Sequence, residues 1–427
     1  MAKGGYQWTL DGPLPLIEDH SRAKHDVLRA YLVNYLRILA QSPRSSGVKV
    51  TLVDGFAGGG QYRSRNGALV PGSPLILFDA LREARALVLQ DRAERGFQGS
   101  YVIRAHVHLV EPDRGANEYL TRLLRDSAGL IDANTSYQIH LGTFEAALET
   151  ILTDIRSRQR GGRSVFILDQ YGWSQVRLPL IHSIFQKLPS AEVFLTWMID
   201  SLINFISEQT VDKLNPALAK AGFAQYLGAE QLLAMKREKA DDDLTWRRAI
   251  QTLLAGEIRS TSGAAYCTPF YIVPRNSRRG YWLLHLAQHL RANEEMKRIH
   301  WSNNNLHHPG GPGLNMLGYI GTGGQLGFDH RFDDRANDVT HNALVEDLPR
   351  RISEQHAPIR FGDLVALTAN ETPAQRAQIQ DAVFWLAQRK QLSVTTLSGS
   401  TRRGARGLAD DDVIEFPSQL WLLPGRA

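Results

Sequence analysis

The order of apolar strands and amphipathic helices in the first half of the chain restricts its fold more than any other feature. Five apolar runs read as strands, and an amphipathic segment follows each of the first four; the runs are 48–53, 105–110, 137–141, 164–169 and 191–198. Continuous apolar strands that alternate with helices are typical of a parallel sheet covered on both faces. We therefore predict an α/β fold with helices on both faces of one sheet.

Three further regions extend this pattern. Residues 201–263 lack strand patterns and predict a helical insertion that caps the sheet, while residues 265–289 predict an antiparallel hairpin at the end of the sheet. The last part of the chain predicts helices and a β-hairpin with a basic tip, which is the outline of a winged helix. We expect an α/β domain over 1–200 and 264–345, the insertion over 201–263, and a winged-helix-like C-terminal module over 346–427.

Charge and cysteine content narrow the classes of function. The 427-residue chain has a net charge of +5 and a pI near 9.2, which permits contact with nucleic acid without requiring it. Cys267 is the only cysteine, so an internal disulfide framework and a cysteine-based metal site are excluded, and we expect no metal centre. No signal peptide or apolar run of membrane length is present in the sequence, so we expect a cytoplasmic protein without membrane contact.

The ends of the first two strands carry residues suited to a nucleoside-type ligand. A glycine-rich loop follows the first strand, and glycines let a ligand approach the backbone closely. Glu111 ends the second strand, where a carboxylate can accept both ribose hydroxyls, and Asp113 is better explained as the cap of the next helix. A tight turn without a ligand is the alternative for the loop. The predicted cofactor contacts here are Asp54, Gly55, Phe56, Gly58, Gly60 and Glu111.

The third and fourth strand ends supply further candidates. Thr143 and Phe144 follow the third strand near the expected adenine, although Phe144 equally continues the apolar stripe of the next helix. Asp169 and Tyr171 follow the fourth strand in the middle of the sheet, where a carboxylate can guide a proton and an aromatic ring can stack on a planar acceptor. Packing under the cap is the alternative for Tyr171 and for Trp173.

These motifs resemble those of known methyltransferases. VDGFAGGG and ILDQYG are similar in layout to the DPFAGSG and DPPY elements of DNA and RNA amino-methyltransferases, which have a Rossmann-like fold. SRAKHDVLRAYL, GSPLIL, HLVEPD and YWLLHLAQHLRANEEMKRIHW further resemble the three-Cys-motif partner protein (TcmP) family, bacterial proteins related to methyltransferases. The likeness spans roughly residues 16–305 with the motifs in order.

The resemblance implies a cofactor and a partner. S-adenosylmethionine would lie with its methionine half against the glycine loop and its ribose on Glu111, and Asp169 would face the methyl acceptor. The family is named for a neighbouring protein with a three-cysteine motif, which implies an iron–sulfur or radical-type partner encoded nearby. Two departures are Gln170, where amino-methyltransferases prefer proline, and the segment of about a dozen residues between the glycine loop and the next helix.

Two rival functions remain open at this level. A non-catalytic adaptor with a methyltransferase fold, binding nucleic acid or delivering substrate to the partner, is favoured by Gln170 and by the appended module. A metal-dependent hydrolase would use His300, His307, His308 or His341, but their spacing matches no known ligand set. The basic tip of the C-terminal hairpin predicts contact with DNA or RNA phosphates through Arg402, Arg403 and Arg406, unless the neighbouring aspartates neutralise it.

Overall fold

One seven-stranded sheet forms the centre of the protein. The computed structural model describes residues 6–17, 19–159, 161–223, 227–238, 243–272, 281–302, 334–402 and 407–417. The strands are β1 (Gly47–Asp54), β4 (Val102–Glu111), β5 (Thr135–Leu141), β6 (Ser164–Leu168), β7 (Ala191–Trp197), β8 (Tyr266–Ile272) and β9 (Tyr281–Ala287), in the spatial order β5-β4-β1-β6-β7-β9-β8. The first five are mutually parallel and β9 pairs antiparallel with both of its neighbours.

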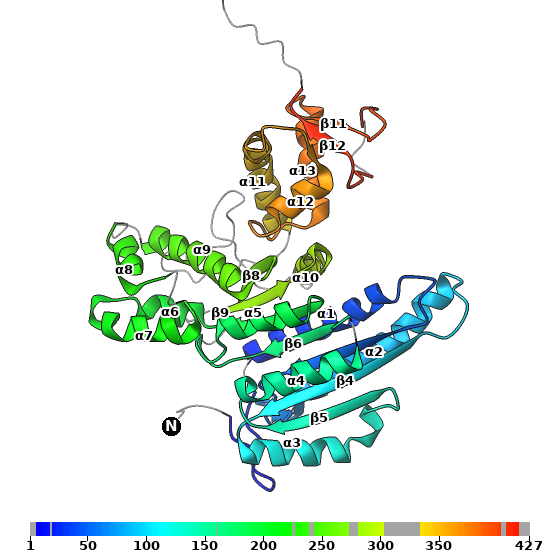
Figure 1. Ribbon diagram of the computed structural model, residues 1–427, viewed down its shortest axis with the longest axis vertical. Helices are drawn as coiled ribbons and strands as arrows, with labels where there is room; N and C mark the ends of the chain where they lie inside the picture. Colours follow the sequence, from blue (N-terminus) through cyan, green and yellow to red (C-terminus); the bar gives the residue numbers. More distant parts are fainter. Residues whose placement is uncertain are drawn as a thin grey trace, which may run out of the picture.

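Helices cover both faces of this sheet, as the sequence predicts (Figure 1). One face packs against α1 (Asp19–Leu39), α2 (Ser73–Glu94), α3 (Arg114–Asp126) and α10 (Leu290–Ser302). The other packs against α4 (Phe144–Arg158) and α5 (Leu178–Lys187). The strand order reverses direction between β1 and β6, which is the arrangement of Rossmann-like sheets, and the predicted fold class is confirmed.

Short elements complete the α/β domain. The segment after the glycine loop is a two-stranded hairpin, β2 (Gln61–Arg63) with β3 (Leu69–Pro71), and a turn of 3-10 helix, η1 (Ala128–Leu130), follows α3. Between β7 and β8 lies a run of helices: α6 (Ile199–Phe205), η2 (Glu208–Thr210), α7 (Val211–Ala221), α8 (Ala229–Glu238) and α9 (Asp243–Ser262). These helices share the hydrophobic core of α4 and α5, so they extend that face of the sheet.

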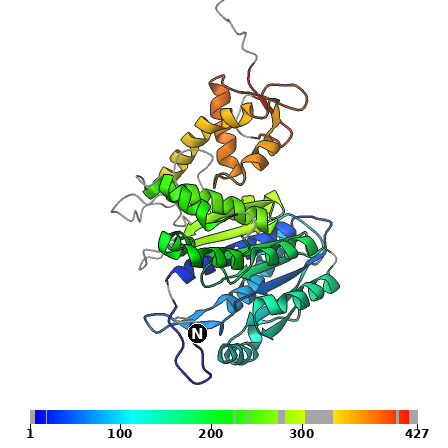
Figure 2. The ribbon, with the colours of Figure 1, turned by 60° about the vertical axis from the view of Figure 1, so that its left-hand side comes forward.

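The C-terminal residues have a hydrophobic core of their own. They form α11 (Asp334–Ser353), β10 (Ile359–Arg360), α12 (Phe361–Thr368), α13 (Arg376–Gln388), β11 (Ser393–Thr395) and β12 (Val413–Glu415). The three strands make an antiparallel sheet in the order β10-β12-β11. The expected module boundary at residue 346 falls inside α11, whose Leu344 and Leu348 belong to this core. Figures 1 and 2 show these elements at one end of the molecule, and in Figure 1 they lie beyond α10.

A membrane-spanning helix was not expected from the sequence. Within the described part of the chain, every helix is too short or too polar to cross a bilayer.

Candidate active site at the carboxyl ends of the strands

Asp54 is the innermost charged group of the candidate site. It ends β1, is fully buried, and its Oδ1 accepts a hydrogen bond from the Phe56 amide at 3.1 Å. The Oδ2 atom makes no hydrogen bond of normal length with the described residues. Burial raises the pKa of Asp54 to about 7, against the opposing effects of Ser73 and the Phe56 amide, and the charges of Asp169 and Glu111 add to the rise.

Glu111 connects the second strand end to the glycine loop. Its Oε2 accepts from the Gly58 amide at 2.8 Å and its Oε1 from the Asp113 amide at 2.7 Å. Burial raises the pKa of Glu111, although these two hydrogen bonds oppose the rise. Because a carboxylate offers about four acceptor positions, two positions remain for a ligand's hydroxyl groups. Asp113 itself caps α3 by accepting from the Ala116 amide at 2.8 Å, which is the role expected for it.

The glycine loop adopts conformations that only glycine tolerates well. Gly58 has a φ of +58° and Gly60 a φ of +81°. A Cβ on Gly55 would lie 2.7 Å from Leu168 and 2.9 Å from Phe144, so the loop lies directly on the core below it. Phe56, which was expected to contact the cofactor, is partly buried against the same core.

Asp169 forms the acceptor-side part of the site together with Lys24, a residue that sequence analysis assigned no role. The Lys24 Nζ lies 2.6 Å and 2.7 Å from the two Asp169 oxygens. Lys24 is 11% exposed and Asp169 is 34% exposed, so the pair is open on the carboxylate side. Burial acts to raise the pKa of Asp169, but Lys24, Thr196 and His25 together lower it. Asp169 is therefore an anion at neutral pH.

Neutral groups surround this ion pair. Burial first, and then Lys24, lowers the pKa of His25 to about 4, so the ring is uncharged at pH 7. Burial raises the pKa of Tyr281 well above its ordinary value, and the charge of Asp169 adds to the rise. The pKa of Tyr62 is likewise raised by burial, with contributions from all three strand-end carboxylates. Both phenols thus keep their protons and remain hydrogen-bond donors beside the acids.

The loop after β6 is organised by Gln170. Its Oε1 accepts from the amides of Gln175 and Val176, each at 2.9 Å, and its side chain is buried. Tyr171 is 71% exposed, which leaves its ring free of the core, whereas Trp173 packs against the core and lies 6.4 Å from Trp197. Gln170 therefore holds the turn that presents Tyr171 to solvent.

The residues after β5 have structural roles in this conformation. Thr143 caps α4, with its hydroxyl accepting from the Ala146 amide at 3.3 Å. Phe144 is buried and lies 6.4 Å from Phe166, ring to ring. Both residues lie next to the candidate site, and Phe144 lies beneath Gly55. Their contact with an adenine stays a prediction.

An N-terminal segment that the sequence analysis did not single out covers the glycine loop. Trp8 is buried, its Nε1 donates to the Gln61 carbonyl at 2.8 Å, and its ring lies where side chains on Gly58 and Gly59 would project. Tyr6 and Tyr62 complete an aromatic cluster with Trp8, with centroids 5.0–5.9 Å apart. The only sequence signal for this contact is an aromatic pair in a polar N-terminal stretch, which does not identify its target.

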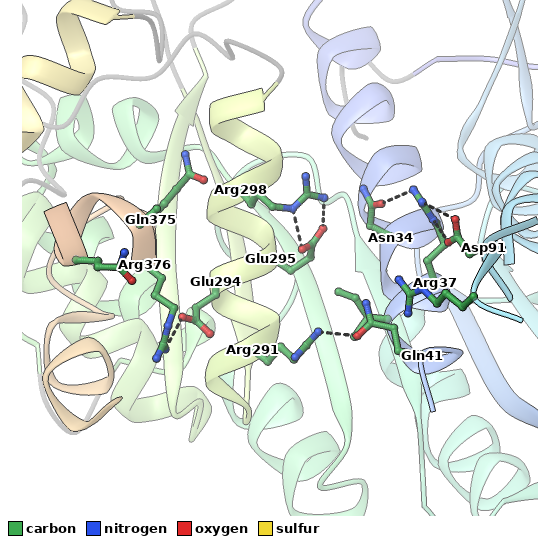
Figure 3. Close-up of a pocket in the computed structure, with 14 residues that line it drawn as sticks. Asn34, Arg37, Gln41, Asp91, Arg291, Glu294, Glu295, Arg298, Gln375 and Arg376 are labelled. Atoms are coloured by element: carbon green, nitrogen blue, oxygen red, sulfur yellow. Dashed lines mark hydrogen bonds and ion pairs between the residues drawn. The ribbon is translucent and has the colours of Figure 1, made fainter. Parts of the chain in front are cut away.

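A hollow in the structure lies away from the strand ends (Figure 3). It has a volume of about 660 Å³ and lies among α1, α10 and α13, with five arginines facing three carboxylates. Three of the arginines are paired: Arg37 with Asp91, Arg298 with Glu295 one turn away on α10, and Arg376 with Glu294. Because the Arg376–Glu294 pair joins α13 to α10, we interpret the hollow as a polar interface between the C-terminal elements and the α/β domain, with more arginines than carboxylates.

Of the three predicted phosphate-contact residues, the structure describes Arg402. Arg402 pairs with the buried Asp412, its Nε and a terminal nitrogen lying 2.9 Å and 3.2 Å from the two carboxylate oxygens. This is the neutralisation by neighbouring aspartates considered as the alternative. Arg403 and Arg406 lie outside the described residues.

The strand order and the charged groups at the carboxyl edge define a Rossmann-like α/β protein with a candidate ligand site at its switch point. No family model and no curated protein matches the chain. One solved structure found by comparison is Trm1 from Pyrococcus horikoshii in complex with S-adenosyl-L-methionine, at 10% identity and a TM-score of 0.30, over 92% of this chain and 95% of that one. A likeness this weak carries no argument, so the fold class rests on the topology.

Proposed function

We propose that the protein is an S-adenosylmethionine-dependent methyltransferase of the three-Cys-motif partner type. The observation that carries the proposal is the convergence of Asp54, Glu111 and Asp169 on one edge of the sheet, each at the end of a parallel strand beside the switch point. This edge supplies a glycine loop, a carboxylate at the end of the second strand and another at the end of the fourth. Such a set of groups suits a nucleoside ligand with a cationic centre.

The residues present fit this cofactor. The unbonded Oδ2 of Asp54 is a buried acceptor that a cationic or N–H-bearing ligand would satisfy. Gly58 and Gly60 give the loop its tight, positive-φ turns beside the strand ends, and Glu111 retains acceptor positions for the ribose hydroxyls. When bound, S-adenosylmethionine supplies an electrophilic methyl group.

The acceptor side is built to hold a nucleophile and its proton. Asp169 is anionic and partly open, so it can accept a hydrogen bond from an amine or hydroxyl. Lys24 restrains the carboxylate through both oxygens, and Tyr281 lies under the Lys24 ammonium, 5.4 Å from ring centroid to Nζ. The exposed Tyr171 ring stands on the turn after Asp169, where a planar acceptor could stack.

Calorimetry with S-adenosylmethionine and S-adenosylhomocysteine tests the cofactor. We expect one site per chain and a weaker interaction in Glu111→Gln, because the ribose would lose a charged acceptor while the side chain keeps its shape. Glu118→Gln on the exposed face of α3 is the matched control and should bind as the wild type does. Absence of binding heat and of thermal stabilisation by both ligands in the wild type would refute the cofactor assignment.

Asp169→Asn separates catalysis from cofactor binding. We expect turnover to fall by at least about 100-fold while cofactor affinity stays within a few fold, because general-base help and proton acceptance act on the transition state. Loss of cofactor affinity in Asp169→Asn would instead place Asp169 in the cofactor site. Mass spectrometry of nucleic acids from cells with and without the protein and its genomic neighbour supplies the acceptor for this assay.

Nucleic acid is the acceptor class that we favour. Supporting this, the C-terminal helices and the β10-β12-β11 sheet follow in the order expected for a winged helix, and the sequence between β11 and β12 contains the three arginines. Since Arg402 is bound to Asp412, the phosphate contact would depend mainly on Arg403 and Arg406. Such contacts position nucleic acid without reading its sequence.

Two variants distinguish a phosphate-binding role from a structural role for the arginines between β11 and β12. Arg403→Ala/Arg406→Ala should weaken binding uniformly across sequences and reduce its salt dependence, since fewer counterions are released. Arg402→Ala should mainly lower stability, because it leaves the buried Asp412 without its ion pair. An equal affinity and salt slope for the double variant and the wild type would reject the contact.

A non-catalytic adaptor is the second candidate. It is favoured by Gln170, whose side chain is committed to the backbone of its own loop in place of the proline of amino-methyltransferases. If the protein is an adaptor, the Asp169→Asn variant should bind the three-cysteine partner as the wild type does and leave the partner's activity unchanged. If it is a methyltransferase, the Asp169→Asn variant should form less methylated product. A pull-down with the three-cysteine partner, followed by the methylation assay, therefore separates the two.

A further inference from the structure

A histidine cluster lies on the sheet face covered by α4, separate from the candidate active site. His106 and His108 are two residues apart on β4, so their side chains point to the same face, and both are buried. Asp154 on α4 lies above them, with its Oδ2 3.1 Å from the His108 Nε2 and 3.7 Å from the His106 Nε2. One ligand atom from each of the three side chains lies within 4.8 Å of the others.

The Nδ1 atoms of both imidazole rings already have hydrogen-bond partners. The His106 Nδ1 lies 2.7 Å from the Ser136 Oγ, and the His108 Nδ1 lies 3.0 Å from the His140 Nε2. With a proton on each Nδ1, both Nε2 atoms present lone pairs toward Asp154. Metal-binding histidines are oriented in this way by acceptors at their second nitrogen.

A hydrogen-bonded network alone does not account for every atom of the cluster. The His108 Nε2 can donate to Asp154, but the His106 Nε2 is buried with no hydrogen-bond partner among the described residues. A bound cation would supply the missing partner of the His106 Nε2.

The spacing suits a tetrahedral ion. Two ligands at 2.0–2.1 Å from zinc are about 3.3 Å apart, and the observed 3.1 Å and 3.7 Å bracket that value. Two imidazoles and a carboxylate are a common ligand set for divalent transition metals. His106 also lines a pocket of about 330 Å³ between β1, β4 and β5.

We propose that His106, His108 and Asp154 bind a divalent transition metal ion of the zinc class. The ion would join α4 to β4, the strand that ends in Glu111, on the sheet face that α4 covers. His140 and Ser136 position the two rings. Arg158, whose Nε lies 2.5 Å from the Asp154 Oδ2, competes with the ion for that oxygen. This assignment differs from our expectation, drawn from sequence alone, that the chain has no metal centre.

Metal titration of the full-length protein tests the assignment. Protein freed of metal with a chelator should bind one equivalent of Zn²⁺, gain thermal stability on binding, and give the visible spectrum of tetrahedral Co²⁺ when loaded with cobalt. His106→Gln, His108→Gln and Asp154→Asn should each weaken Zn²⁺ by more than about 100-fold, since even residues outside the ligand set contribute 10–100-fold. Arg158→Met should strengthen binding by removing the competing cation.

Two controls keep the result interpretable. His182→Gln removes an exposed histidine on α5 and should leave Zn²⁺ affinity unchanged. X-ray absorption on the zinc-loaded wild type counts imidazole and carboxylate ligands without any variant, so it decides the case even where a substitution prevents folding. A wild type that binds less than one equivalent, or a folded His106→Gln with wild-type affinity, overturns the assignment.

Discussion

Asp54 has the most deeply buried carboxyl group of the three strand-end acids. Its carboxyl group is fully buried at the end of β1, near Glu111 and Asp169, and has an unbonded oxygen. Burial penalises the charged form, so the pKa rises from the ordinary 3.8 to about 7. A cationic ligand would favour the ionised form, so the same residue links ligand binding to proton release.

The pH dependence of stability tests this environment. Between about pH 4 and pH 7 the folded protein keeps the Asp54 proton and the unfolded chain loses it, so the free energy of unfolding falls as pH rises, by up to about 1.4 kcal/mol per pH unit. Above pH 7 this contribution becomes constant. We expect Asp54→Asn to remove the slope and Asp79→Asn, on α2, to retain it, as measured by denaturant unfolding across this pH range. Identical slopes in Asp54→Asn and wild type would show that Asp54 ionises normally.

At the scale of the elements, α1 and the N-terminal segment complete the site that the strands begin. α1 carries Lys24 to Asp169, and two turns further along it Tyr31 donates to Glu192 on β7, which also lies 3.0 Å from His285 on β9. The N-terminal segment places Trp8 on the glycine loop. These contacts fix helix, sheet and loop relative to one another, because each joins elements far apart in the chain.

Because Trp8 contacts the glycine loop, we expect alanine substitutions at two glycines to lower the stability of the protein by different amounts. Gly58→Ala places a side chain at positive φ and 2.9 Å from the Trp8 ring, so we expect a loss of about 1–2 kcal/mol from the backbone plus a further loss from the contact. Gly67→Ala, in the β2–β3 turn, has a similar φ of +83° with open space around it and should show the backbone part alone. Chemical denaturation measures both, and equal losses would mean that Trp8 does not restrict the loop.

At the scale of the whole molecule, α10 joins the C-terminal elements to the sheet. The Lys297 Nζ donates to the Ala369 carbonyl at 2.8 Å, and the Trp301 Nε1 donates to the Pro373 carbonyl at 3.0 Å. Asn370 accepts from the Cys267 amide at 2.8 Å, so β8 takes part as well. The Arg376–Glu294 pair of Figure 3 extends this interface to α13. Many polar contacts of good geometry predict that the two parts keep one arrangement.

Lys297 makes this interface dependent on pH. Burial lowers its pKa from 10.5 to about 7, so between these values the unfolded chain binds more protons than the folded protein. The free energy of unfolding should therefore rise with pH from about 7 to 10, the reverse of the Asp54 effect. Lys297→Met should flatten this rise, and Lys187→Met, on the exposed face of α5, should not. A rise that survives in Lys297→Met would assign it to another group.

The sequence by itself determined the parallel sheet, the helices on both faces, and the positions of Asp54, Glu111 and Asp169 at strand ends. It did so because hydrophobic periodicity and glycine content are local properties, and parallel strands bring their carboxyl ends to one edge. Only the tertiary structure decided that Lys24 binds Asp169, that Gln170 holds its own loop, and that His106, His108 and Asp154 meet. Lys24 and Asp169 are 145 residues apart, and such pairings depend on how α1 and α4 lie on the sheet, which no local pattern specifies.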